Sequence, residues 1–353
     1  MSSSSAYRLA NFRSPPYDKS TKNCYRNPGF LYLSRGPSSL YGDEQGACAF
    51  NLGGTRMESN NKSLMLVDGM ALLFRAFYAT AVSGQFMINS KGVPTNGVQG
   101  FVKHMLTAVS SFNPSHVAVC WDMGSKTFRT EMFQDYKGNR GEAPIELIPQ
   151  FDLVKEIVEA FDIPNIGLEG YEADDCIGTI AKNIEDDIDI HILTGDRDIL
   201  QLLDERVRVI LLQKGYGNYL VHTKESFFEE KGILPHQMID VKALMGDPSD
   251  NYPGVKGIGE KTALKLIQQF EHVDGVISNL DQLTKGQRAK IEQDLEMLHL
   301  SRKLAAIHCE VPITYSLDEA HFRINRTKVL SKFEEVEFKG LTRFLELNEA
   351  YVG

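Results

Sequence analysis

The stretch SLMLVDG, at residues 63–69, is a short apolar run that ends in an aspartate and a glycine. Three similar runs follow it, at residues 116–121 (HVAVCW), 189–194 (DIHILT) and 206–212 (RVRVILL). Runs this short and this apolar are typical of buried β-strands. Helical apolar spacing fills the intervals, at residues 98–112, 151–161 and 173–184. Strands that alternate with helices predict an α/β fold with a mostly parallel sheet flanked by helices.

The second half of the chain has a different pattern, because the strand signals fade from about residue 232. Helical spacing predicts further helices at residues 238–245, 262–270, 284–306 and 326–348. We therefore expect a core over residues 63–231 and a helical subdomain over residues 232–353. No apolar run approaches the roughly 20 residues that a membrane-spanning helix needs, so we expect no membrane association.

The first 62 residues differ from the rest in composition. They hold ten serines, several arginines and Pro-Pro and Gly-Pro pairs, with no sustained helical or strand period. Serine- and arginine-rich, acid-poor N-termini are typical of organelle transit peptides. A disordered tail, or a misassigned start with Met57 as the initiator, also fits this composition. The transit peptide predicts a chloroplast or mitochondrial location.

Charge and cysteine content limit the classes of protein. The chain of 353 residues has a net charge of −9, and residues 1–62 contribute eight basic and four acidic residues. The remainder therefore carries −13, which is unusual for a nucleic-acid-binding protein unless cations hold many of the acids. The five cysteines are scattered and lack CxxC spacing. This pattern argues against a disulfide framework or a zinc site.

Carboxylates follow three of the predicted strands directly. These residues are Asp68, Asp122, Asp196 and Asp198. Because the carboxyl ends of parallel strands meet at one edge of a sheet, where ligands bind, we expect these acids to converge.

Two further acidic groups lie outside the strands. Glu172, Asp174 and Asp175 open the predicted helix at 173–184, and Asp247 and Asp250 lie in a turn-rich loop. Helix capping and turn formation are structural explanations for one acid at each place. Three acids within four residues exceed what capping requires.

Nine carboxylates at one edge would raise one another's pKa values unless cations neutralised them. Oxygen ligands without His or Cys favour Mg²⁺ or Mn²⁺, and the number of acids suggests two ions. Two such ions can activate water and stabilise the leaving oxygen of a phosphodiester. The acids alone therefore predict metal-assisted phosphoryl hydrolysis, which a simple phosphatase would fit equally well.

A basic and aromatic segment at residues 128–140 narrows the substrate. It interleaves Arg129, Lys137 and Arg140 with Phe128, Phe133 and Tyr136. Cations can hold a scissile phosphate, and an aromatic face can stack on a terminal base. A solvated helix with a few buried rings is the structural alternative. A stretch containing Gly and Pro follows at 138–149 and suggests a mobile loop or arch.

A glycine-rich segment, PGVKGIGEKTALKLI at residues 253–267, is the second feature that points to DNA. Gly254, Gly257 and Gly259 would form a hairpin whose backbone N–H groups approach a phosphate at the start of a helix. Lys256, Lys261 and Lys265 add positive charge against Glu260. The spacing differs from nucleotide-binding motifs and favours a helix–hairpin–helix that grips a DNA backbone.

Six ordered motifs together resemble the 5′–3′ exonuclease domain of bacterial DNA polymerase I, in the flap endonuclease superfamily. They are VDG (67–69), WD (121–122), YKGNR (136–140), GYEADD (170–175), LTGDRD (193–198) and MGDPSDNYPGVKGIGEKTA (245–263). The resemblance covers about residues 63–350. It implies a PIN-like core, a helical arch at about 128–150 and a helix–three-turn–helix DNA clamp at about 238–270.

The resemblance also implies a two-metal site. The first ion would take Asp68, Asp122, Glu172 and Asp174, and the second would take, or share, Asp175, Asp196, Asp198, Asp247 and Asp250. Residues assigned a direct part in catalysis are Asp68, Asp196, Asp198, Lys137 and Arg140. Those assigned to DNA are Arg129, Tyr136, Lys137, Arg140, Gly254, Lys256, Gly257, Gly259, Lys261 and Thr262. Lys137 and Arg140 would steer the phosphate, Tyr136 would stack on a base, and the clamp would bind K⁺.

Because the sequence stops at Gly353 without a polymerase domain, it resembles a free-standing, monomeric plant organellar enzyme. Its expected substrates are DNA 5′ ends, flaps and RNA primers, and its expected partner is an organellar DNA polymerase. Two alternatives stay open at this point. One is a PIN-type ribonuclease acting on organellar RNA, and the other is a DNA-junction-binding protein that has lost catalysis.

Overall fold

The computed structural model of the protein describes residues 62–81, 84 and 86–347. The expected transit peptide lies outside these residues, apart from Lys62, and remains a prediction. Among the helices that the structure describes, none combines the length and apolar character needed to cross a bilayer.

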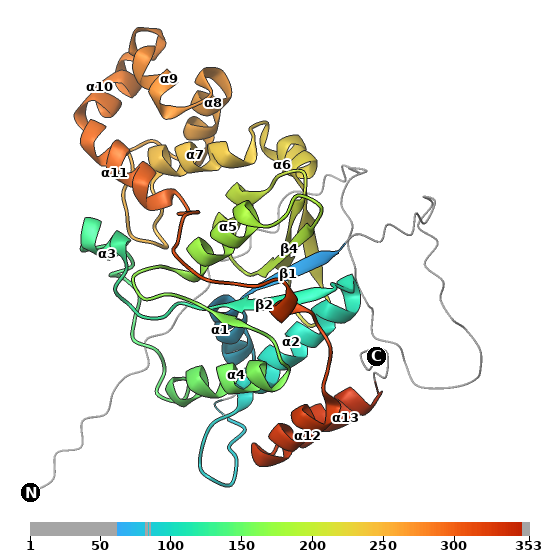
Figure 1. Cartoon of the computed structure of the whole chain (residues 1–353). Helices are drawn as coiled ribbons and strands as arrows, with labels where there is room; N and C mark the ends of the chain where they lie inside the picture. Colours follow the sequence, from blue (N-terminus) through green and yellow to red (C-terminus); the bar gives the residue numbers. More distant parts are fainter. Residues whose placement is uncertain (1–61, 82–83, 85, 348–353) are drawn as a thin grey trace, which may run out of the picture. The chain divides into compact units, whose positions relative to one another are not determined.

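A six-stranded sheet forms the centre of the fold, in the order β3-β2-β1-β4-β5-β6 (Figure 1). The strands are β1 (Ser63–Asp68), β2 (His116–Cys120), β3 (Asn165–Ile166), β4 (Asp189–Thr194), β5 (Val207–Leu212) and β6 (Tyr219–His222). All neighbours pair in parallel except β5 and β6, which are antiparallel. The predicted fold class is confirmed. The short strands β3 and β6 have no counterpart in the sequence prediction.

Strand β1 is buried on both faces because it lies in the middle of this sheet. Its alternate side chains enter two different cores. Leu64 and Leu66 pack with α5 (Ala173–Asn183) on one face. Met65 and Val67 pack on the other face with α1 (Gly69–Ala81), α2 (Asn96–Phe112) and α4 (Ile148–Ala160). A parallel strand covered by helices on both sides needs a continuous apolar run, which explains the sequence SLMLV.

Gly69 allows α1 to start directly after the last residue of β1. A Cβ atom at this position would lie 2.4 Å from the ring of Trp121, which follows β2. The missing side chain therefore lets the first turn of α1 pack against the indole. This close packing fixes Asp68 and Asp122 at neighbouring strand ends.

Helices dominate the chain after β6. They are α6 (Lys224–Lys231), α7 (Met238–Met245), α8 (Glu260–Phe270), α9 (Val273–Ser278), α10 (Lys285–Gln293), α11 (Leu295–Ala305), α12 (Arg326–Glu335) and α13 (Lys339–Leu347). A short helix α3 (Phe128–Met132) lies in the expected arch segment. Single turns of 3₁₀ helix occur at Asp198–Leu202, Pro235–Gln237, Leu280–Gln282 and Asp318–Ala320.

Two of the predicted long helices are broken in the structure. The helix expected at 284–306 divides at Asp294, whose carboxylate accepts a hydrogen bond from the backbone of Lys256 at 2.8 Å. The helix expected at 326–348 divides before Lys339, because Glu337 has a left-handed backbone with φ of 64°. Apolar spacing continues across both breaks, so the spacing alone did not reveal them. Helices α12 and α13 then pack into the core that contains α4.

Candidate metal centre

A first group of carboxylates lies at the carboxyl edge of the sheet. Asp68 ends β1, and its Oδ1 accepts a hydrogen bond from the backbone of Ala71 at 2.9 Å. Its Oδ2 accepts one from the hydroxyl of Thr194, the last residue of β4, at 2.7 Å. Burial raises the pKa of Asp68 to about 7, and the charges of Asp122 and Asp196 add to this effect. The two hydrogen bonds therefore fix the carboxylate in position. Among the described residues, no cation forms an ion pair with it.

Asp122, Asp174 and Asp196 complete this first group. Asp122 accepts a hydrogen bond from the backbone of Ala173 at 2.7 Å, which joins the end of β2 to the start of α5. Burial raises the pKa of Asp174 well above its usual range, and repulsion from Asp68 and Asp196 raises it further. Among the described residues, no lysine or arginine forms an ion pair with any member of this group. Such a set of oxygens fits a hard divalent cation.

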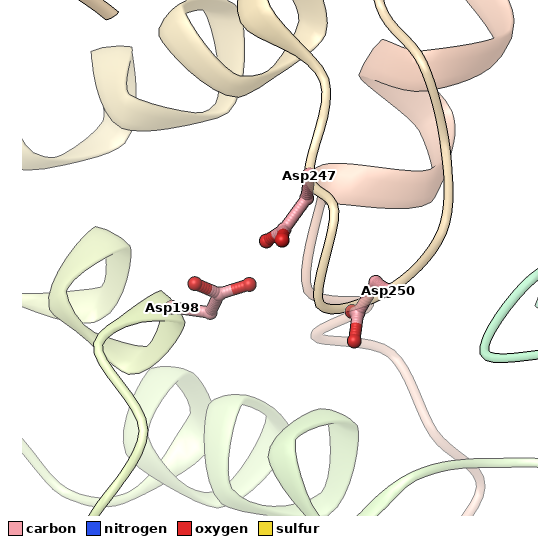
Figure 2. A group of neighbouring side chains, drawn as sticks. All are labelled: Asp198, Asp247 and Asp250. Atoms are coloured by element: carbon pink, nitrogen blue, oxygen red, sulfur yellow. The ribbon is translucent and has the colours of Figure 1, made fainter. Parts of the chain in front are cut away.

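A second group brings together acids from both halves of the chain. Carboxylate oxygens of Asp198, Asp247 and Asp250 all lie within 4.8 Å of one another (Figure 2). Asp198 follows β4, whereas Asp247 and Asp250 lie in the loop after α7. The hydroxyl of Tyr252 is buried beside them without a hydrogen-bond partner among the described residues. Three converging oxygens and an unsatisfied hydroxyl fit an ion with its bound water.

Two cations lie against these three acids, and a third lies against the nearby Glu172. Lys242 of α7 donates hydrogen bonds to Asp198 and Asp247. Arg140 donates to Asp250 at 2.7 Å, and Lys137 donates to Glu172 at 2.7 Å. The sequence analysis did not single out Lys242. The sequence feature that could have indicated Lys242 is a lysine among the apolar residues of a predicted helix, five positions before Asp247.

Asp175 and Arg129 are paired with each other inside the protein, away from the positions that the sequence analysis expected for a metal ligand and a DNA contact. Asp175 is fully buried and Arg129 is 2% exposed, and they form two hydrogen bonds of 2.8 and 2.7 Å. Asp175 also accepts from the backbone of Glu172 and His308. Arg129 donates in addition to the carbonyls of Leu304 and Ala306. Because these groups are fully paired within the protein, a metal ion or DNA could contact Asp175 or Arg129 only if these bonds broke, and the two assignments stay predictions.

Tyr136 does not present the open aromatic face that the sequence analysis predicted. Its side chain is only 4% exposed, and its ring lies 6.5 Å from that of Tyr252. The hydroxyl donates to Glu172 at 3.2 Å and to Asp250 at 3.0 Å. Tyr136 thus connects Glu172 to Asp250 of the second group in this structure, and a base could stack on it only after the segment moved.

A cleft of about 570 Å³ opens beside the first group, between the sheet edge and the 128–141 segment. Asp122, Glu172, Lys137 and Arg140 all line it, with Lys137 bonded to Glu172. Its apolar lining comes from residues to which the sequence analysis gave no role, namely Met70, Phe74, Met123 and Phe151. The cleft therefore combines acids that fit a metal ion, cations that fit a phosphate and an apolar surface.

The glycine hairpin joins α7 to α8 as predicted, but its glycines have different roles. Gly254 is buried with φ of 59°, and a Cβ there would lie 2.2 Å from the backbone nitrogen of Gly246. Gly254 therefore allows the close packing of this loop against Gly246, and its contact with DNA stays a prediction. Gly257 (φ of 81°) and Gly259 are exposed at the start of α8. Lys256 and Lys261 are exposed beside them, and Thr262 is half-buried.

Comparison with known proteins identifies the family. Residues 63–232 match the 5′-3′ exonuclease N-terminal resolvase-like domain, and residues 233–328 match the 5′-3′ exonuclease C-terminal SAM fold. The chain belongs to the 5′–3′ exonuclease family.

This member of the family is similar to bacterial proteins over most of its described length. It is 59% identical over 287 residues to a 5′-3′ exonuclease of Bacillus subtilis, which covers 81% of this chain and 97% of the relative. It is 42% identical to DNA polymerase I of Bacillus caldotenax, covering 81% of this chain but 32% of the polymerase. The resemblance to the exonuclease domain of bacterial DNA polymerase I is thus confirmed.

The exonuclease fold is shared with solved structures of lower identity. A bacteriophage T5 flap endonuclease, solved in a pseudo-enzyme-product complex with DNA and metal ions, superimposes with a TM-score of 0.57 at 23% identity. The superposition covers 82% of this chain and all of the T5 chain. This likeness shows that the two chains share a fold.

Replacing Arg129 with Met should lower the free energy of unfolding by about 3–5 kcal/mol, because Asp175 would stay buried without its partner. Urea denaturation measures this change. Arg140→Met is the matched control, since its partly exposed pair with Asp250 should contribute no more than about 1 kcal/mol. Similar losses in the two variants would contradict the structural role of Arg129.

The stability of the exonuclease should depend on pH in a metal-dependent way. Burial raises the pKa of Asp68 to about 7 and that of Asp198 to about 6, from an ordinary value of 3.8. Since the folded state keeps these protons longer than the unfolded state, stability in a chelator should fall as pH rises from about 4 to about 7. Urea denaturation at pH 4.5, 6 and 7.5 measures the slope.

A saturating divalent ion should remove most of this slope, and Asp68→Asn should reduce it in the chelator. An equal slope with and without the ion would show that the acids do not form an ion site.

Proposed function

We propose that the chain is a divalent-metal-dependent, structure-specific nuclease that acts on DNA as a 5′–3′ exonuclease and a 5′-flap endonuclease. The observation that carries this proposal is the pair of carboxylate groups at one sheet edge, one of which needs residues from both halves of the chain. The 59% identity to a 5′-3′ exonuclease of Bacillus subtilis supports the reaction and its direction.

Two Mg²⁺ ions, for which Mn²⁺ can substitute, are the proposed cofactors. Asp68, Asp122, Asp174 and Asp196 would hold the first ion, with Glu172 at the border of the two groups. Asp198, Asp247 and Asp250 would hold the second. The bound ions would supply an activated water and stabilise the leaving oxygen of the phosphodiester.

The surrounding side chains would position the DNA. Lys137 and Arg140 line the same cleft as Asp122 and would bind the scissile phosphate. The exposed backbone of Gly257 and Gly259 and the side chains of Lys256 and Lys261 would grip the duplex phosphates without reading sequence. A K⁺ ion at this hairpin is part of the proposal.

We further propose that the enzyme works as a monomer in a plant chloroplast or mitochondrion, where it removes RNA primers and repairs flaps beside an organellar DNA polymerase. The composition of residues 1–62 supports import into an organelle.

A fluorescent protein fused behind residues 1–62 should enter chloroplasts or mitochondria in plant cells, because the leader is basic, serine-rich and poor in acids. Confocal microscopy with organelle markers reads the result, and the unfused fluorescent protein is the control. A diffuse cytosolic signal from the fusion would contradict the proposed location.

The nuclease should cut a 5′-flap DNA in Mg²⁺ faster than it cuts single-stranded RNA, because the hairpin and the cleft suit a duplex junction. Gel analysis of end-labelled substrates at equal concentration measures both rates. A preference for RNA would favour the PIN-type ribonuclease instead.

In the same assay, the double substitution of Asp196→Asn and Asp198→Asn should abolish cutting, whereas flap binding in Ca²⁺ should be largely kept. Unchanged cutting by this variant would rule out the assigned site. Tight binding without any cutting by the wild type would favour a junction-binding protein.

A further inference from the structure

Lys242 is a buried lysine in the middle of the second carboxylate group. Its side chain belongs to α7 and is 8% exposed. The ammonium donates hydrogen bonds to Oδ1 of Asp198 and to Oδ2 of Asp247. Lysine is rarely buried unless its charge is paired, so these two carboxylates are what keeps it there.

The oxygens that hold Lys242 belong to the carboxylates that would hold the second metal ion. Asp198, Asp247 and Asp250 have oxygens within 4.8 Å of one another, and Figure 2 shows Asp198 and Asp247 pointing into the space between them. A divalent ion held by these carboxylates would need the same oxygens as ligands. The ammonium already lies at hydrogen-bond distance from two of them. A lysine ammonium and a divalent cation would repel each other strongly at such a separation.

Among the described residues, no lysine or arginine is bonded to the first carboxylate group in this way. Asp68, Asp122, Asp174 and Asp196 form no ion pair among the described residues. Lys137, which pairs with Glu172, is close enough to lower the pKa of Asp174 but forms no ion pair with these four acids. An ion that reaches the first group therefore relieves repulsion between carboxylates without breaking an ion pair of its members. An ion that reaches the second group must first move Lys242 away.

The geometry points to Lys242 as the resident cation of the second ion site, which it occupies until a metal ion displaces it; we propose that this exchange makes the two ions bind in order. The first ion binds tightly to the free protein and the second binds more weakly. The inference rests on the proposed metal-dependent function and assigns Lys242 a positioning role. Its long, flexible side chain allows the ammonium to swing aside while the backbone of α7 stays in place.

The neighbourhood of Lys242 fits this exchange. The hydroxyl of Tyr252 is buried near the same carboxylates without a partner among the described residues. It is therefore free to bond to water on an incoming ion. The hydroxyl and backbone of Ser249 bond to Oδ1 of Asp247, at 2.6 and 2.7 Å, and leave Oδ2 to the ammonium. Asp247 thus keeps its orientation when Lys242 departs.

Mn²⁺ binding to the full chain without DNA tests the proposal. Calorimetry and the electron paramagnetic resonance of free Mn²⁺ give the number of bound ions and their affinities. The wild type should bind one ion tightly and a second at least about tenfold more weakly. Lys242→Met should bind the second ion at least about tenfold more tightly than the wild type, because a unit charge beside its ligands is gone.

Two further variants keep the result specific. Lys242→Arg retains the charge and should keep the weak second site, although its geometry changes. Lys224→Met removes an exposed ion pair with Glu205 away from the acids and should leave both affinities unchanged. Thermal unfolding supplies a second readout. Without metal, Lys242→Met should melt below the wild type, and Mn²⁺ should raise its Tm more than it raises that of the wild type.

Equal second-ion affinities in the wild type and Lys242→Met would overturn the proposal, as would two equally tight sites in the wild type. If Lys242→Met does not fold without metal, the comparison of the wild type with Lys242→Arg and the stoichiometry of the wild type still decide. Flap cleavage by the wild-type preparation distinguishes failure of the role proposed for Lys242 from failure of the proposed nuclease function. Cleavage with two equally tight sites refutes only the role of Lys242, whereas loss of both ion binding and cleavage refutes the proposed function.

Discussion

The buried ion pair between Arg129 and Asp175 connects three segments that are far apart in sequence. Arg129 belongs to α3, Asp175 to the first turn of α5, and the carbonyls of Leu304 and Ala306 complete the bonds of the arginine. An ion pair of this kind is costly to form and costlier to break on one side. It ties the arch segment and the end of α11 to the helix that begins at Glu172. The carboxylates of the two halves therefore meet in a defined geometry.

The two carboxylate groups at the acidic edge of the sheet differ in how far nearby cations neutralise them. The acids near β1 and β2 have no cationic partner among the described residues, and burial raises the pKa values of Asp68 and Asp174. The acids from the second half are neutralised by Lys242 and Arg140. The same edge thus contains one group that attracts cations directly and one that already holds them. The net charge of −13 outside residues 1–62 is partly explained by this concentration of acids.

The arch segment is held by bonds that a substrate and metal ions would compete for. Lys137 contacts Glu172, Arg140 contacts Asp250, and Tyr136 contacts both acids. Lys137 and Arg140 could bind a scissile phosphate only after their bonds to these carboxylates had broken. The segment also bonds to the loop of Asp250 through its backbone, from Lys137 to the carbonyl of Asp250 at 2.8 Å. Occupation of the acids by ions and release of the arch are therefore physically linked.

The sequence by itself determined the fold class, four of the six strands and the family. Short apolar runs that end in Asp68, Asp122 and Asp196 specify buried parallel strands, because only such strands need apolar side chains on both faces. The glycine hairpin was also visible, because glycines cluster where the backbone takes conformations that other residues avoid. Gly257 has such a left-handed backbone before α8. These features depend on neighbouring residues along the chain.

Only the tertiary structure decided which charges are free. Asp174 and Asp175 are adjacent and chemically identical, yet one faces the acidic edge and the other is buried against Arg129. Arg129 and Arg140 lie in one segment, yet one is inside the protein and the other lines the cleft. Lys242 became part of the site only because α7 places it beside Asp198, 44 residues away. The partner of a charged group is set by contacts between distant segments, which local sequence patterns do not encode.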